Sequence, residues 1–160
     1  MNQERLKFIH NTIVHWIDKT DTKAQIFLGI QLAILGYLLA NLKYSNFLKN
    51  YNITFLLFLI SLLFIFLSIF YLLRVLWPRL STSEHISYIY FKHIEERYRH
   101  DKKKAIHDYN ELKDDEFDND LISQIISLSI VGTSKYKDLQ KIVIILSVEI
   151  ILVILMLILG

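Results

Sequence analysis

The sequence predicts an all-α membrane protein with three transmembrane helices, an N-terminal amphipathic helix and a small cytosolic helical unit between the second and third spans. Three apolar stretches carry this prediction: nineteen uncharged residues follow Lys23, twenty-four follow Lys49, and the last nineteen residues contain one charge, that of Glu149. A bilayer core of about 30 Å needs about 20 helical residues to cross it. With one Pro and four Gly in 160 residues, the chain has few of the turn residues that a sheet needs.

The first 22 residues are predicted to form an amphipathic helix. Their apolar side chains recur at helical spacing, at Leu6, Ile9, Ile13, Trp16 and Ile17. We expect this helix to pack on the cytosolic segment rather than lie on the membrane surface, because its polar face is not strongly cationic. The first span is predicted over 24–42 and the second over 54–77. An interfacial Trp77 and the helix breaker Pro78 mark the end of the second span.

The region 79–138 is predicted to be the cytosolic helical unit. It contains a helix over 84–94, a strongly charged stretch after it, and an acidic run at 114–120 that we expect to be a solvated turn. The last carboxylates of this run are expected to cap the next helix, because they accept hydrogen bonds from its free N–H groups. One long helix is predicted over 121–159, and its second half, 140–159, is the third span.

The distribution of basic residues predicts the orientation of the chain. Four Lys and Arg precede the first span, two lie in the loop between the first and second spans, and twelve lie between Arg74 and Lys141. Cytoplasmic flanks carry the excess of positive charge. We therefore expect a cytosolic N-terminus and a periplasmic or extracellular C-terminus. The net charge of +2 does not favour a nucleic-acid partner, and the marginal core of so small a soluble part favours a homo-oligomer.

Three motifs stand out along the chain: Trp16-Ile17 followed by Asp21-Thr22-Lys23-Ala24, Ser87 followed by Phe91 and Ile94, and Asp120-Leu121 followed by Gln124, Ile130 and Lys135-Tyr136. With these motifs the chain resembles the Pycsar transmembrane effector family. The resemblance implies a bacterial anti-phage effector of the inner membrane. Such an effector senses a cyclic pyrimidine mononucleotide, cCMP or cUMP, made by a partner uridylate or cytidylate cyclase. It then impairs membrane integrity and causes abortive infection.

A cyclic nucleotide needs a cation for its phosphate, polar groups for the ribose and an aromatic wall for the base. Three basic residues spaced by four form a stripe near the bilayer: His15, Lys19 and Lys23. The alternative is an anchor beside anionic lipid. Asp21 lies about 200° from Lys23 on a continuous helix, so the two do not grip one group. We expect Asp21 to cap a span or to pair with Arg97 or Lys135.

The central region adds further candidates for the nucleotide site. Gln124, Ser127 and Lys135 fall within about 80° of one helical face, although helix packing and interface anchoring explain them as well. Arg97 belongs to a charge run that is equally typical of a solvated face. The aromatic wall is expected among Tyr88, Tyr90, Phe91 and Tyr98, with a core position as the alternative for Phe91.

Glu149 is the one ionisable residue deep in the third span. A charge at that depth costs a few kcal/mol at least, so its side chain should face other helices or water. Gln31, at a comparable depth in the first span, is the expected partner. Both are candidates for pore formation or assembly, and packing alone is the alternative.

No catalytic constellation is apparent in the sequence. It contains no phosphate loop, no nucleophile elbow and no cysteine, and the seven-residue spacing of His93, His100 and His107 does not suit a metal site. We therefore expect no enzyme activity, no cofactor and no metal. A constitutive membrane scaffold or a transporter accessory subunit without a nucleotide ligand is the alternative function.

Overall fold

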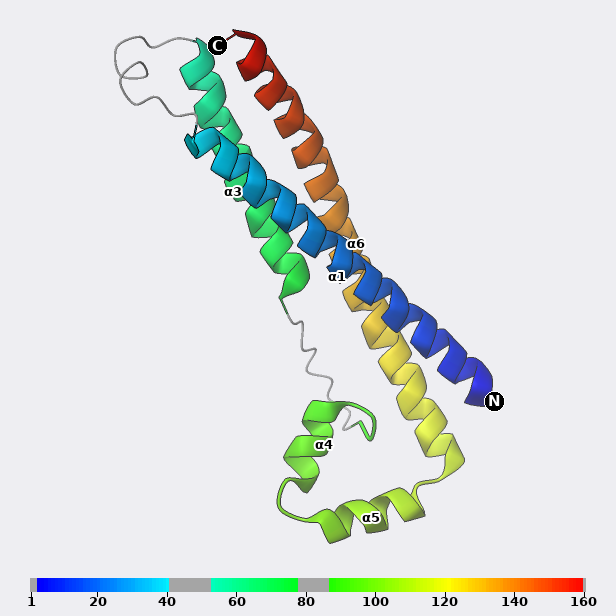
Figure 1. Cartoon of the computed structure of the whole chain (residues 1–160). Helices are drawn as coiled ribbons and strands as arrows, with labels where there is room; N and C mark the ends of the chain where they lie inside the picture. Colours follow the sequence, from blue (N-terminus) through cyan, green and yellow to red (C-terminus); the bar gives the residue numbers. More distant parts are fainter. Residues whose placement is uncertain (1–2, 41–52, 78–86, 160) are drawn as a thin grey trace. The chain divides into compact units, whose positions relative to one another are not determined.

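A computed structural model describes residues 3–40, 53–77 and 87–159. These residues form helices and no strand (Figure 1): α1 (Gln3–Ala40), α3 (Ile53–Leu76), α4 (Phe91–Tyr98), α5 (Lys102–Glu111) and α6 (Asp114–Leu159). Among the described helices, α1, α3 and α6 are long and apolar enough to cross a membrane. The all-helical fold and its three candidate spans are therefore confirmed. Three parts of the predicted segments, 1–2, 41–42 and 79–86, lie outside the described residues.

Helix α1 is continuous through the predicted boundary between the N-terminal helix and the first span. The Thr22 hydroxyl donates to the Asp18 carbonyl at 2.9 Å, and Thr12 makes the same bond to Phe8 at 2.8 Å. Because these hydroxyls are satisfied within their own helix, they do not interrupt it. The ranges 1–22 and 24–42 thus belong to one helix over the residues described.

The helix predicted over 84–94 begins later, at Phe91. Ser87 is the reason, because its hydroxyl oxygen accepts from the backbone N–H groups of Ile89 at 3.1 Å and Tyr90 at 3.0 Å. A side chain that binds nearby N–H groups offers the backbone an alternative to a helix. The charged stretch that follows contains a second break. Asp101 accepts from the Lys104 N–H at 2.9 Å and so caps the start of α5.

The prediction of a solvated turn at 114–120 is wrong, because α6 begins at Asp114 and includes the whole acidic run. Three carboxylates, those of Asp114, Asp115 and Glu116, occupy its first turn. Negative side chains are favourable there because the free N–H groups give the helix a partial positive charge at its start. The run therefore lengthens the helix rather than preceding it.

The chain divides into two compact units. The span unit comprises residues 18–78 and 134–160, and the small-helix unit comprises residues 1–17 and 79–133. Helices α1 and α6 contribute residues to both units, α3 lies in the span unit, and α4 and α5 lie in the small-helix unit. Each unit has its own buried residues.

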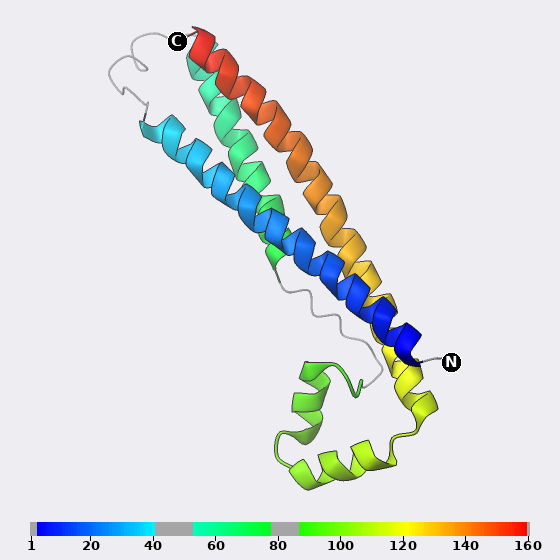
Figure 2. The same ribbon diagram turned by 45° about the vertical axis from the view of Figure 1, so that its right-hand side comes forward.

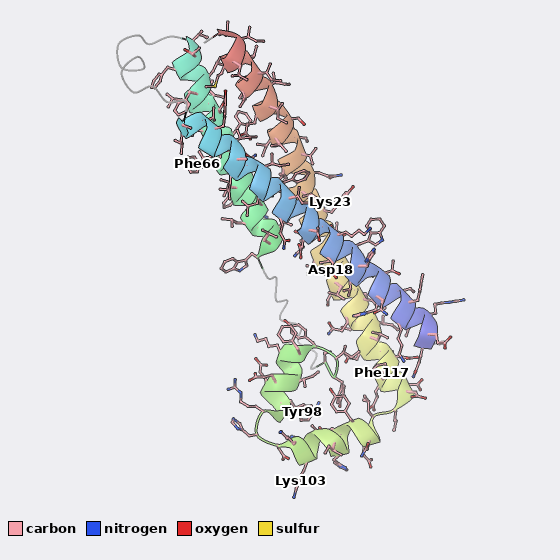
Figure 3. All side chains as sticks on the ribbon, viewed as in Figure 1. Asp18, Lys23, Phe66, Tyr98, Lys103 and Phe117 are labelled. Carbon is pink, nitrogen blue, oxygen red and sulfur yellow. The ribbon has the colours of Figure 1, made fainter. Side chains whose placement is uncertain are left out.

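In the span unit, segments of α1, α3 and α6 lie side by side (Figure 2) and enclose two apolar clusters. The first cluster contains Ala24, Leu72, Val75, Leu139 and Ile142. The second contains Leu38, Phe58 and Ile65, with Val153 and Met156 packed beside it. Large apolar side chains also cover the outside, including Phe66 on α3, which is 62% exposed (Figure 3). Such outward apolar residues are expected of helices that face lipid.

The small-helix unit buries few apolar side chains. Leu6, Tyr98 and Leu121 are its buried hydrophobic residues among those described. The start of α1 approaches α6 closely at Gly132, where an added Cβ atom would lie 3.3 Å from Ile17. Most other contacts in this unit are polar or aromatic.

Candidate functional site

Asp21 and Lys135 form a buried ion pair in the span unit. The Lys135 ammonium group donates to both Asp21 carboxylate oxygens, at 2.6 and 2.7 Å, and Lys135 is only 6% exposed. The pairing that the sequence predicted for Asp21 is confirmed. Because Lys135 is buried, in contrast to the partly exposed Arg97, its ammonium group is not open to a phosphate.

The other basic residues of α1 are exposed on one face. His15, Lys19 and Lys23 all have exposed side chains and retain the i, i+4, i+8 spacing of a stripe. His15 belongs to the small-helix unit, whereas Lys19 and Lys23 belong to the span unit (Lys23 is labelled in Figure 3). None of the described contacts joins them to the polar side chains of α6. Their role as a phosphate site stays a prediction.

A second buried charge cluster lies between α3 and α6 of the span unit. Asp138 is 3% exposed and faces Arg74 at 3.4 Å and Lys141 at 3.7 Å. Both cations also approach Tyr71, with the Arg74 guanidinium carbon 5.8 Å and the Lys141 amine 5.0 Å from the ring centroid. The basic ends of the second and third spans are thereby fixed to one carboxylate.

Arg97 is the centre of an aromatic and acidic cluster in the small-helix unit. Its guanidinium carbon lies 5.0 Å from the centroid of the Tyr88 ring and 5.3 Å from that of Tyr98, distances typical of cation–π contacts. Its terminal nitrogen lies 3.0 Å from Asp108 of α5. Figure 3 labels Tyr98 on α4. Arg97 and two residues of the expected aromatic wall, which the sequence suggested as separate candidates, therefore lie in one cluster.

Residues of α5 and α6 complete this cluster. The Tyr98 hydroxyl donates to Asp108 at 3.0 Å, and the Tyr109 hydroxyl donates to the Tyr88 carbonyl at 2.5 Å. Asp120 accepts from the Tyr88 N–H at 2.7 Å and from the Ser87 hydroxyl at 3.0 Å. We name the set of Tyr88, Arg97, Tyr98, Asp108, Tyr109 and Asp120 the Arg97 cluster.

The environment of the cluster shifts the titration of its members. Burial, followed by the hydrogen bond to Asp108, raises the pKa of Tyr98 to about 12. Burial and the negative charge of Asp120 also raise the pKa of Tyr109. A hydrogen bond with the Tyr88 side chain raises the pKa of Arg97, so its guanidinium stays charged. At neutral pH the Arg97 guanidinium is therefore charged, and the Tyr98 and Tyr109 phenols are neutral.

The sequence missed Asp108, Tyr109 and Asp120 as members of the candidate site. Asp108 and Tyr109 lie on α5, and their only sequence signal is an aromatic residue in an otherwise polar helix. Conversely, apart from the two tyrosines of the expected aromatic wall, Arg97 is the one residue predicted for the nucleotide site that belongs to the Arg97 cluster, and the other residues predicted in the central region lie outside it. Gln124 and Ser127 are half-buried on α6, and Phe91 is 68% exposed beside Tyr90.

Glu149 pairs with Gln31 as expected. The Gln31 amide nitrogen donates to one Glu149 carboxyl oxygen at 2.7 Å, and both residues are fully buried in the span unit. Glu149 lies 14 residues after Lys135, about 21 Å along α6. The span unit thus has two polar pairs at well-separated depths.

A family model described as the Pycsar effector protein domain matches residues 5–160, almost the whole chain. The chain belongs to the Pycsar effector family. No curated protein and no solved structure matches it. Family membership identifies an effector of anti-phage defence, and the three long apolar helices identify a membrane protein.

Proposed function

We propose that this Pycsar effector senses cCMP or cUMP through the Arg97 cluster and then impairs the bacterial inner membrane, which causes abortive infection. The main observation in support of this proposal is that the charged guanidinium of Arg97 lies between two tyrosine rings in the small-helix unit. A guanidinium binds phosphate through charge-assisted hydrogen bonds. Aromatic rings provide a stacking surface for the base.

Two carboxylates support this choice over the basic stripe of α1. A carboxylate oxygen of Asp108 lies 3.0 Å from a terminal nitrogen of Arg97. In the proposed complex, the cyclic phosphate would take the place of this carboxylate. Asp120 is 1% exposed, and its Oδ1 has no hydrogen-bond partner. A buried acceptor of this kind suits a donor of the ligand, such as a ribose hydroxyl or the amino group of cytosine. The cluster therefore offers a cation, rings and an acceptor together.

The proposed orientation puts the small-helix unit in the cytosol. The excess of Lys and Arg between Arg74 and Lys141 supports this orientation under the positive-inside rule. There the unit would receive the diffusible product of a partner cyclase. The C-terminal end of α6 is then periplasmic or extracellular.

Self-association is part of the proposal. The small-helix unit exposes Phe8 (72%), Trp16 (63%), Ile126 (56%) and Ile130 (67%), four large apolar side chains outside the apolar spans. Exposed apolar residues gathered on a small unit are typical of an interaction surface. Ligand binding would favour the assembly that damages the bilayer. To move an assembly from 1:99 to 99:1, the ligand must bind the active form about 10⁴-fold more tightly.

Calorimetry on the detergent-solubilised full chain tests the site. We expect cCMP or cUMP to bind and cAMP to bind more weakly, and Arg97→Ala to lower the affinity at least about tenfold because a charge-assisted contact is lost. Arg99→Ala is the matched control, because Arg99 is exposed and ion-paired with Glu95 one turn away. Equal affinity in the two variants would place the nucleotide elsewhere. Absence of binding by every cyclic mononucleotide would favour a constitutive scaffold.

A leakage assay tests the membrane activity. Full-length protein in liposomes should release a trapped dye after addition of the nucleotide that calorimetry identifies. Arg97→Ala should release dye only at a correspondingly higher nucleotide concentration. Ligand-independent leakage of equal rate in both proteins would contradict the sensing step.

A further inference from the structure

One buried polar residue from each helix of the span unit lies between its two apolar clusters. Gln31 follows Ala24 of the first cluster and precedes Leu38 of the second. Ser68 lies between Ile65 and Leu72 on α3, and Glu149 lies between Ile142 and Val153 on α6. All three side chains are 0% exposed. Their positions along the three helices place them between the two apolar clusters, and we name these three residues the polar layer.

Each member of the polar layer has an unpartnered oxygen: Gln31 Oε1, Ser68 Oγ and Glu149 Oε1. Other hydroxyls of the span unit have partners: Ser147 Oγ donates to the Val143 carbonyl at 2.8 Å, and Ser61 Oγ donates to Met156 Sδ at 3.8 Å. Ser68 Oγ has no such partner, so its hydroxyl stays available to the layer. A buried acceptor without a donor costs about 1–3 kcal/mol, so three in one layer indicate that a positively charged or hydrogen-bond-donating ligand belongs there.

The chemistry of the Gln31–Glu149 pair identifies that ligand. Gln31 Nε2 donates to Glu149 Oε2 at 2.7 Å, which leaves one acceptor oxygen on each side chain. A proton on Glu149 Oε1 would donate to Gln31 Oε1 and close a cyclic pair of two hydrogen bonds between a carboxylic acid and an amide. One proton therefore satisfies both oxygens and removes the cost of a charge in the apolar unit.

We propose that the polar layer is a proton-binding site, in which Glu149 is held as a neutral acid by Gln31 and the Ser68 hydroxyl bonds to the same layer. A metal cation such as Na⁺ fits less well, because the side chains supply only three unpartnered oxygens and helical backbone carbonyls are engaged in their own helices. The proposal concerns the span unit alone and is independent of nucleotide sensing.

Other titratable groups of the three helices lie in different layers. On α6 the nearest are Asp138 and Lys141, which bond to each other and to groups of α3. On α3 they are Tyr71 and Arg74, both beside Lys141 or Asp138. On α1 they are Tyr37 and Lys23, both exposed. Glu149 is therefore the group that can take up or release the proton in this layer.

The sign of the pH effect follows from linkage. If the packed span unit holds a proton that the dissociated helices release, stability rises as pH falls and is lost as pH rises. A rise in pH would then loosen the packing of the three spans without any nucleotide.

Thermal unfolding of the detergent-solubilised full chain, followed by Trp fluorescence over neutral and alkaline pH, tests the site with three variants. Glu149→Gln keeps the shape and supplies an amide N–H where the acid O–H would be, so it mimics the protonated form. We expect its Tm to equal or exceed that of the wild type, with a smaller fall at alkaline pH. Gln31→Leu should lower the Tm, whereas Gln25→Leu, on the exposed face of α1, is the matched control and should not.

Two outcomes would overturn the proposal. A Tm of Glu149→Gln well below the wild-type value at neutral pH would mean that the carboxylate is needed in its charged form. A wild-type Tm that rises when Na⁺ replaces an organic cation, at constant pH and ionic strength, would show a metal ion instead. Infrared spectroscopy gives an independent check, because the carbonyl band of a protonated carboxylic acid should be present at neutral pH and absent from Glu149→Gln.

Discussion

Different kinds of contact stabilise the interior of each of the two units. Among the described residues, the span unit buries ten hydrophobic residues, namely Ala24, Leu38, Phe58, Ile65, Leu72, Val75, Leu139, Ile142, Ile145 and Leu146. Its polar groups form two separate pairs and the charge cluster around Asp138. The small-helix unit buries Leu6, Tyr98 and Leu121, and a connected network of hydroxyls, carboxylates and one guanidinium joins its helices. A polar ligand competes directly with such a network, whereas apolar packing offers it nothing to replace. Under the proposed function, the small-helix unit is therefore the one that a nucleotide would rearrange.

The largest expected effect is in the span unit, at the Asp21–Lys135 pair. Asp21→Leu leaves the buried Lys135 ammonium group without its carboxylate, which should cost about 3 kcal/mol of unfolding free energy. Replacing both residues by Leu should recover much of this loss, because no uncompensated charge is left. Thermal unfolding in detergent measures both variants. Lys137→Leu, at an exposed position on the same helix, should change little. A single variant as stable as the wild type would contradict the buried pair.

A smaller effect is expected in the small-helix unit at Asp120. Asp120→Ala removes the acceptor for the Ser87 hydroxyl and the Tyr88 N–H, and we expect a loss of about 2 kcal/mol because both donors lie in partly or fully buried positions. Hydrogen exchange should accelerate at the Tyr88 amide and in α4. Asp115→Ala removes an exposed carboxylate of the first turn of α6 and serves as the control. Unchanged exchange at Tyr88 would show that Asp120 does not hold this segment.

Tyr98→Phe should cost about 1 kcal/mol at neutral pH, because one hydrogen bond to Asp108 is lost. Its pH dependence is more specific. An unfolded tyrosine loses its proton near pH 10, but the folded pKa of Tyr98 is raised to about 12, first by burial. Between these values the unfolded chain is ionised and the folded chain is not, so the wild type loses stability as pH rises.

The alkaline loss should be smaller in Tyr98→Phe, as measured by hydrogen exchange or thermal unfolding between neutral pH and about pH 11. Tyr136→Phe, at a side chain that is 54% exposed, is the control and should follow the wild type. If stability falls equally with pH in the wild type and in Tyr98→Phe, the pKa of Tyr98 is not raised in the folded protein.

The smallest effect is expected at the exposed Glu95–Arg99 pair. Its two side chains are 47% and 65% exposed and lie one turn apart on α4 and its C-terminal cap. Solvent screens such pairs, so Glu95→Gln should change stability by less than about 0.5 kcal/mol. A double-mutant cycle with Arg99→Gln measures the coupling. A coupling above about 1 kcal/mol would show that this pair belongs to the network of the small-helix unit.

The sequence predicted the pairs of the span unit better than the network of the small-helix unit. Few polar groups lie in the apolar helices, so Asp21 had two suggested partners and Glu149 had one at its depth. The partners of Arg97 depend on two breaks in the chain, the Ser87 turn and the Asp101 cap. These breaks decide where α4 and α5 begin, and they leave no periodic signal that would have linked Arg97 to Asp108.

The acidic run at 114–120 was assigned wrongly from the sequence for a different reason. A cluster of carboxylates is typical of a turn and also of the first turn of a helix, and composition alone does not separate the two. The start of α6 at Asp114 decides between them. The same extension brings Asp120 into the helix, where its carboxylate reaches the turn that precedes α4.

The contact between Arg97 and Asp108 also affects how rarely such an effector would be activated in an uninfected cell. An effector that harms its own host must ignore the phosphates that are always present there. With a carboxylate already on the guanidinium, an incoming anion binds only in the fraction of molecules in which that contact is open, and its apparent affinity falls by the same fraction. If the proposed site is correct, Asp108 acts as a tethered competitor and sets a threshold affinity that a ligand must exceed. Common anions that bind weakly would have too low an affinity to displace Asp108. A ligand that also contacts the tyrosine rings and Asp120 would bind tightly enough to do so.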